Sequence, residues 1–284
     1  MNPPAPASAR AVCIGVFDSG VGGLSVLRSL RALMPDARFL YVADSGHAPY
    51  GERDEAYVVE RARSLTAHLL AEGAQMVVVA CNTATAAAVQ ALRERWPAVG
   101  FVGVEPGLKP AIALSRNGRI GVMATRGTLQ SAKFRRLVET HAAGVELRLQ
   151  PCDGLARALE EGDADAPAVR ALVERHAAPL REAGVDTVVL GCTHYPFAAP
   201  QIAAALGPEV ALVDTAEAVA LQARRLAAGL PPGAGGPDLL WTSGEPAVLQ
   251  RVARRWLGWA GEARALPETA AAWCPESGSN RYGP

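Results

Sequence analysis

The chain has 284 residues, half of them hydrophobic and a fifth charged, so it can form one or two folded domains with a core. Its 28 Lys and Arg residues balance its 28 Asp and Glu residues, which leaves no overall charge to attract nucleic acid or an anionic membrane. The N-terminal residues 1–10 lack the apolar region of a signal peptide, and no run reaches the roughly 18 apolar residues of a membrane span. We therefore expect a cytoplasmic protein whose five cysteines are thiols.

Short apolar runs alternate with helical patterns along the first part of the chain. Strands are expected at 11–17, 38–43 and 76–80, and helices at 24–33, 57–72 and 83–95. The strands are apolar on both faces, which is typical of parallel sheets covered by helices.

The pattern then begins again near residue 119. Gly15–Ser19 aligns with Gly121–Thr125 at an offset of 106 residues, and Val77–Thr83 aligns with Val188–His194 at an offset of 111. Two matches in the same order at nearly the same offset indicate a duplicated half. Because ligands bind at the carboxyl ends of parallel strands, the duplicated turns should line one cleft.

These patterns predict an α/β protein with two pseudo-symmetric parallel-sheet domains and the active site in the cleft between them. The first domain is expected to comprise 11–105 together with 214–262, and the second 106–213. A Pro- and Gly-rich linker at 231–237 precedes a short strand at 239–242 and a helix at 247–257. Residues 1–10 and 267–284 are expected to be flexible tails.

Two cysteines follow equivalent strands. Asn82 and Thr83 come after Cys81 and can cap a helix, while the residues after Cys192 include Pro196, which suits a first helical turn. A helix start can bind a carboxylate and favours a thiolate. It contributes only roughly 0.3–1 kcal/mol, or about 2 if buried, so it shifts a thiol pKa by about one unit. A working base therefore needs a further partner, for which Asp18 and His194 are candidates.

Two opposed thiols suit the inversion of a stereocentre, because one acid/base group can remove a proton from one face while the other delivers a proton to the opposite face. The route through pyridoxal phosphate needs a Schiff-base lysine, and Lys109 and Lys133 lie in no recognisable cofactor motif. We therefore expect no cofactor. We also expect no metal site, since the remaining histidines are scattered. Of the other cysteines, Cys13 is expected in the core, Cys152 to be structural, and Cys274 to have no role.

Taken together, four motifs in order resemble those of glutamate racemases. They are Val16–Leu24, Ala43–Asp44 with Pro49–Gly51, Ala80–Thr85 and Gly191–Pro196, and the resemblance runs from 14 to 242. Members of that family interconvert L- and D-glutamate without a cofactor and supply D-glutamate for peptidoglycan biosynthesis. The resemblance therefore implies a cofactor-independent isomerase with glutamate as its small-molecule partner, and it implies a homodimer.

The resemblance also implies residue roles. Cys81 and Cys192 are the proton donor and acceptor, Asp18 supports Cys81, and His194 with Glu160 supports Cys192. The substrate is held by Asp18, Ser19, Tyr50, Gly51, Asn82, Thr83, Thr193 and His194, and by Thr125, which mirrors Ser19. The sequence before Glu160 departs from the apolar, Pro-containing pattern of the family, so Glu161 is its rival.

Three other functions fit parts of the chain. A dinucleotide-binding protein would explain Gly20 and Gly22, but Ser25 stands where a third Gly or Ala is expected. A thiol hydrolase using Cys192 and His194 predicts a covalent acyl intermediate and one essential cysteine. A relative acting on aspartate would share the fold, whereas the residues after both cysteines resemble the glutamate type.

Overall fold

The computed structural model describes residues 12–267. Cys274, the predicted tail at 1–10 and nearly all of the predicted tail at 267–284 lie outside this part of the chain. Within it, no helix has the length and apolarity that are needed to cross a membrane.

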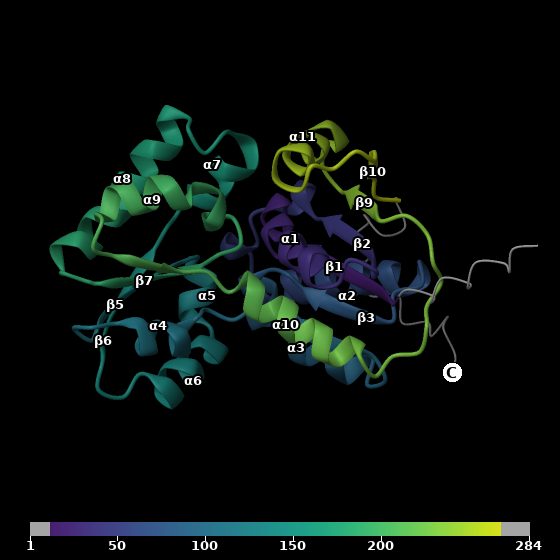
Figure 1. The fold of residues 1–284 in the computed structure, drawn as a ribbon, viewed down its shortest axis with the longest axis horizontal. Helices are drawn as coiled ribbons and strands as arrows, with labels where there is room; N and C mark the ends of the chain where they lie inside the picture. The colour runs from purple at the N-terminus through teal and green to yellow at the C-terminus, as the bar shows by residue number, and fades with distance from the viewer. Residues whose placement is uncertain (1–11, 268–284) are drawn as a thin grey trace, which may run out of the picture.

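A six-stranded parallel sheet forms what we call the first lobe, on the right of Figure 1. Its strand order is β10-β9-β2-β1-β3-β4. The strands are β1 (Cys13–Asp18), β2 (Arg38–Ala43), β3 (Met76–Val79), β4 (Gly100–Gly103), β9 (Leu239–Thr242) and β10 (Ala263–Ala265). The helices of this lobe are α1 (Leu24–Leu33), α2 (Glu55–Ala71), α3 (Asn82–Arg95), α10 (Ala216–Ala227) and α11 (Pro246–Leu257), with short 3-10 turns η1 (Val21–Gly23), η2 (Ser45–His47) and η3 (Tyr50–Glu52).

A four-stranded parallel sheet forms the second lobe, on the left of Figure 1, with the order β6-β5-β7-β8. Its strands are β5 (Arg119–Ala124), β6 (Glu146–Pro151), β7 (Thr187–Gly191) and β8 (Ala211–Val213). Its helices are α4 (Leu108–Leu114), α5 (Arg126–Gln130), α6 (Ala132–His141), α7 (Leu155–Glu161), α8 (Pro167–Glu182), η4 (Tyr195–Ala198) and α9 (Ala199–Leu206).

The two sheets repeat one arrangement. The order β2-β1-β3-β4 in the first matches β6-β5-β7-β8 in the second, so both aligned sequence segments fall on equivalent strands. Gly15 and Gly121 also occupy equivalent environments, because a Cβ at either position would lie 3.1 Å from a leucine of the covering helix, Leu69 or Leu180. The predicted parallel α/β class with two sheets is therefore confirmed.

The C-terminal part of the chain returns to the first lobe. The segment between α10 and β9 has no regular structure, and β9 then pairs with β2. Helix α10 packs along α1. The sheet continues to Ala265, beyond the expected limit at 262, because β10 adds a further parallel strand to β9. The exact domain limits stay a prediction.

Candidate active site

The carboxyl ends of the central strands meet between the lobes. Asp18 ends β1 and Cys81 follows β3, its neighbour in the first sheet. Thr125 and Cys192 follow β5 and β7, which are neighbours in the second sheet. Parallel pairing therefore brings four polar side chains to facing sheet edges, as the duplicated pattern predicted.

Cys81 is the N-cap of α3. Its Sγ accepts a hydrogen bond from the Ala84 amide at 3.4 Å, and its thiol donates to Ser19 Oγ at 3.5 Å. The expectation that Asn82 or Thr83 caps this helix is wrong, because Asn82 already lies in the first turn and the sulfur takes the capping position.

Burial raises the pKa of the Cys81 thiol, and the nearby Asp18 carboxylate raises it further. The Ala84 amide and Ser19 act in the opposite direction but do not outweigh those two effects. Cys81 is therefore a protonated thiol at neutral pH, so its resting form is that of an acid.

Asp18 connects the two lobes. Its buried carboxylate accepts hydrogen bonds from the Ser19 hydroxyl at 2.9 Å, the Gly20 amide at 3.4 Å and the Thr193 hydroxyl at 2.7 Å. Burial raises the pKa of Asp18 above its ordinary value, although the charge of His194 and the hydroxyls of Thr193 and Ser19 act in the opposite direction. Asp18 acts on Cys81 through Ser19 and through its charge, since no direct hydrogen bond between the two side chains is present.

Contrary to expectation, Cys192 does not lie directly at the start of an α-helix. A turn follows it, and then η4, a 3-10 helix of four residues that leads into α9, so no helix N-terminus caps this thiol as α3 is capped by Cys81. The sulfur lies instead 3.8 Å from Nδ1 of His194. The two thiols therefore have different surroundings despite the equivalent strands that carry them.

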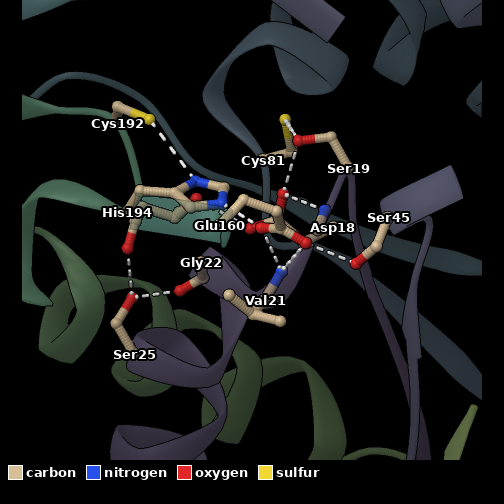
Figure 2. A network of polar contacts seen from close by, with 12 residues as sticks. Asp18, Ser19, Val21, Gly22, Ser25, Ser45, Cys81, Glu160, Cys192 and His194 are labelled. Atoms are coloured by element: carbon tan, nitrogen blue, oxygen red, sulfur yellow. Dashed lines mark hydrogen bonds and ion pairs between the residues drawn. The ribbon is translucent and has the colours of Figure 1, made fainter. Parts of the chain in front are cut away.

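His194 forms a buried pair with Glu160 (Figure 2). Nε2 of His194 lies 2.6 Å from Oε2 of Glu160, and the same carboxylate accepts hydrogen bonds from the Val21 amide at 2.8 and 3.1 Å and from the Ser45 hydroxyl. Glu161 points to solvent and pairs with Arg157 at 3.4 Å. The structure thus places Glu160, and not its rival, on the histidine.

The pair has the charges of an imidazolium and a carboxylate. Burial opposes the charge on His194, yet the hydrogen bonds to Cys192 and Glu160 raise its pKa well above the ordinary value. Burial likewise opposes the charge on Glu160, but its hydrogen bonds to His194, Ser45 and Val21 lower its pKa. Nδ1 of this histidine lies 3.8 Å from the Cys192 sulfur, so the pair is placed to act on that thiol.

Four of the other predicted binding residues are Thr83, Thr125 and Gly51, which meet between the lobes, and Tyr50, which is buried. Thr83 and Thr125 come from opposite lobes, with their hydroxyl oxygens 3.0 Å apart. Gly51 lies against Thr125, because a Cβ on the glycine would be 2.7 Å from the threonine Cβ. Tyr50 is buried and donates its hydroxyl to Asp44, so only its backbone is free to meet a ligand.

Asn82 carries a polar atom without a protein partner. Its Nδ2 is buried and makes no hydrogen bond. It borders a hollow between the lobes that is also lined by Cys192, Thr193 and Thr215, and that is too small to admit a water molecule. A buried amide donor needs an acceptor, so this hollow is a candidate place for a ligand carboxylate.

Sequence reasoning missed two side chains near the site. Asp44 accepts hydrogen bonds from Arg61, Tyr50 and Ser243, and Ser45 contacts Glu160. Asp44 and Ser45 directly follow β2, the other neighbour of β1. The rule that found Asp18 would therefore have found them as well.

The glycine turn after β1 is filled by protein side chains. A Cβ at Gly20 would collide with the Glu160 carboxylate, and one at Gly22 would collide with the His194 ring. These glycines admit the two side chains and leave no space at this turn for a pyrophosphate. This packing argues against the dinucleotide-binding interpretation.

Comparison with known proteins identifies the class. The family model described as Asp/Glu/Hydantoin racemase matches residues 24–223. The chain belongs to this racemase family, and it is an isomerase.

Within that class the similarity is to glutamate racemases. The chain is 49% identical over 246 residues to that of Pseudomonas aeruginosa (strain UCBPP-PA14), covering 86% of this chain and 93% of the relative. It is 52% identical over 250 residues to that of Methylococcus capsulatus (strain ATCC 33009 / NCIMB 11132 / Bath), covering 86% and 92%. The fold matches the Escherichia coli glutamate racemase solved with L-glutamate, with a TM-score of 0.82, 30% identity and coverage of 90% and 97%.

Proposed function

We propose that this protein interconverts L- and D-glutamate by a two-base mechanism in which Cys81 and Cys192 act on opposite faces of the α-carbon. The observation that carries the proposal is the placement of the two thiols after equivalent strands of facing sheets, one beside Asp18 and Ser19 and the other beside His194. The glutamate racemases to which the chain is similar supply the substrate of the proposal.

Inversion of the α-carbon requires two proton transfers, one at each thiol. The Cys192 thiolate takes the α-proton, and the electron pair of the broken C–H bond moves toward the substrate carboxylate. The Cys81 thiol then donates its proton to the opposite face of the same carbon. After the reaction Cys192 is protonated and Cys81 is ionised. This form of the enzyme catalyses the reverse reaction.

The different surroundings match these two roles. The imidazolium of His194 stabilises a thiolate at Cys192, and the negative field of Asp18 favours the protonated thiol at Cys81. In the reverse direction the Ala84 amide, which caps α3 through the sulfur, partly stabilises the Cys81 thiolate.

Substrate binding is assigned to donors around the thiols. The unpartnered Asn82 amide suits a carboxylate, and the Ser19, Thr83 and Thr125 hydroxyls are further donors supplied by the two lobes. The product D-glutamate would serve peptidoglycan biosynthesis in the cytoplasm. A homodimer remains part of the proposal.

Optical rotation tests the function directly. Pure L-glutamate and pure D-glutamate should each lose rotation with the protein alone, and in heavy water the product should gain deuterium at Cα. Aspartate, tested in parallel, should react far more slowly. Unchanged rotation of glutamate with folded protein would contradict the proposal, and racemisation of aspartate alone would replace the substrate.

The two-base mechanism has its own test. Cys81→Ala and Cys192→Ala should each abolish racemisation, whereas Cys13→Ala, which removes a buried thiol within β1, should leave it measurable. An active Cys192→Ala variant would exclude the mechanism. A trapped acyl-enzyme together with a dispensable Cys81 would support the thiol hydrolase instead.

A further inference from the structure

Glu160 reaches from the second lobe into the first. It lies at the end of α7, yet two of its three partners, the Val21 amide and the Ser45 hydroxyl, belong to the first lobe. Its third partner is His194 of its own lobe. The side chain is 10% exposed, so its charge depends on these contacts and not on water.

We propose that Ser45 is a positioning residue for the Cys192 half of the reaction, because its hydroxyl, with the Val21 amide, holds Glu160 against His194 only when the lobes are in contact. This inference rests on the proposed function. Ser45 touches neither thiol and acts through Glu160, which acts through His194.

The chemistry requires such an anchor. A carboxylate with one remaining amide donor can rotate away from the imidazole, and hydrogen bonds to charged groups contribute roughly 1.5–3 kcal/mol. The titratable groups that face His194 are Glu160 from α7, Cys192 from its own turn and Asp18 from β1. Ser45 fixes the first of these.

Isotope effects distinguish this role from a general structural one. L- and D-glutamate have equal free energies, so no variant can lower kcat/KM for one enantiomer alone. The Ser45→Ala variant should lower both by roughly ten- to a hundredfold, the loss of one charged hydrogen bond. Because proton transfer at Cys192 becomes limiting, the isotope effect of Cα-deuterated substrate should rise for one enantiomer and fall for the other.

Matched variants complete the design. Ser45→Thr keeps the hydroxyl and should restore the wild-type isotope effects. Ser243→Ala removes a hydroxyl that contacts the same loop at the Gly46 amide and Asp44 but not Glu160. It should therefore not make the isotope effects of the two enantiomers change in opposite directions. Isotope effects in Ser45→Ala that match wild type, or that change equally for both enantiomers, would overturn the proposal.

A second readout needs no turnover. The NMR titration of the His194 ring should show a lower pKa in Ser45→Ala than in the wild type, with Ser45→Thr near the wild type. An unchanged titration would refute the role of Ser45 even in a protein that racemises glutamate. If the wild type fails to racemise glutamate, the proposed function fails. The titration would still show whether Ser45 holds Glu160 against His194.

Discussion

At the scale of single residues, the candidate site depends on glycines that leave room for its polar side chains. We predict that Gly22→Ala folds but loses activity, because the new Cβ would collide with the His194 ring and displace it from Cys192. A misplacement of about 1 Å can cost roughly a hundredfold in rate. Racemisation kinetics with circular dichroism as the folding check would measure this. Gly229→Ala is the control, since its Cβ meets nothing nearer than 3.9 Å; equal activities would disprove the packing argument.

The charge on Glu160 also sets a pH limit. The pKa of His194 is raised in the folded protein, so its contribution to stability is complete below its ordinary value and is lost as the pH rises through the folded-state value. Glu160→Gln removes the negative partner and lowers that pKa. We expect the basic limb of kcat/KM to move to lower pH and the rate to fall. Glu161→Gln, which alters a surface pair, should leave the profile in place. A basic limb that stays in position in Glu160→Gln would show that His194 does not need this carboxylate.

At the scale of elements, a buried ion pair joins β2 to α2. Arg61 and Asp44 are both fully buried and 2.8 Å apart. Arg61→Ala leaves the carboxylate buried without its cation, so we expect a loss of about 3–5 kcal/mol in the free energy of unfolding. Urea denaturation would measure it. Arg63→Ala, two residues further along the same helix in an exposed pair with Glu60, should cost less than about 1 kcal/mol. Equal losses would mean that Asp44 finds another partner.

Elements with a clear apolar period could be predicted from the sequence. The expected helix at 24–33 and strands at 38–43 and 239–242 match α1, β2 and β9. Strand β6 was missed, because it lies at an edge of its sheet and carries Glu146 and Arg148. Charged edge strands lack the apolar run by which buried strands are recognised.

The site residues that lie at strand ends could be predicted from the sequence. Asp18 and both thiols follow from the duplicated pattern, whereas the contact of Glu160 with Val21 and Ser45 joins residues distant in sequence and in different lobes. The different environment of Cys192 was also hidden, because Pro196 fits both an α-helix and the 3-10 turn that forms.

At the scale of the whole molecule, polar side chains join the lobes across the site. The Asp18–Thr193, Glu160–Ser45 and Thr83–Thr125 contacts all cross from one lobe to the other. Polar interfaces between domains generally permit relative motion. The hollow beside Cys192 is closed in this structure, so we expect the lobes to separate when glutamate enters.

A disulfide across the cleft tests whether this opening is required. In a Gly51→Cys, Thr125→Cys variant the two Cβ atoms, 2.7 Å apart by construction, need to retreat by only about 1 Å to reach disulfide geometry. We expect the oxidised variant to lose racemisation and the reduced variant to recover it, because the bridge holds the lobes in contact and keeps substrate out. Each single variant and the wild type, treated with the same oxidant and reductant, control for loss of the substituted side chains and for oxidation of Cys81 or Cys192. Full activity of the bridged protein, with the bridge verified by mass spectrometry, would mean that glutamate reaches the thiols without separation of the lobes at this contact.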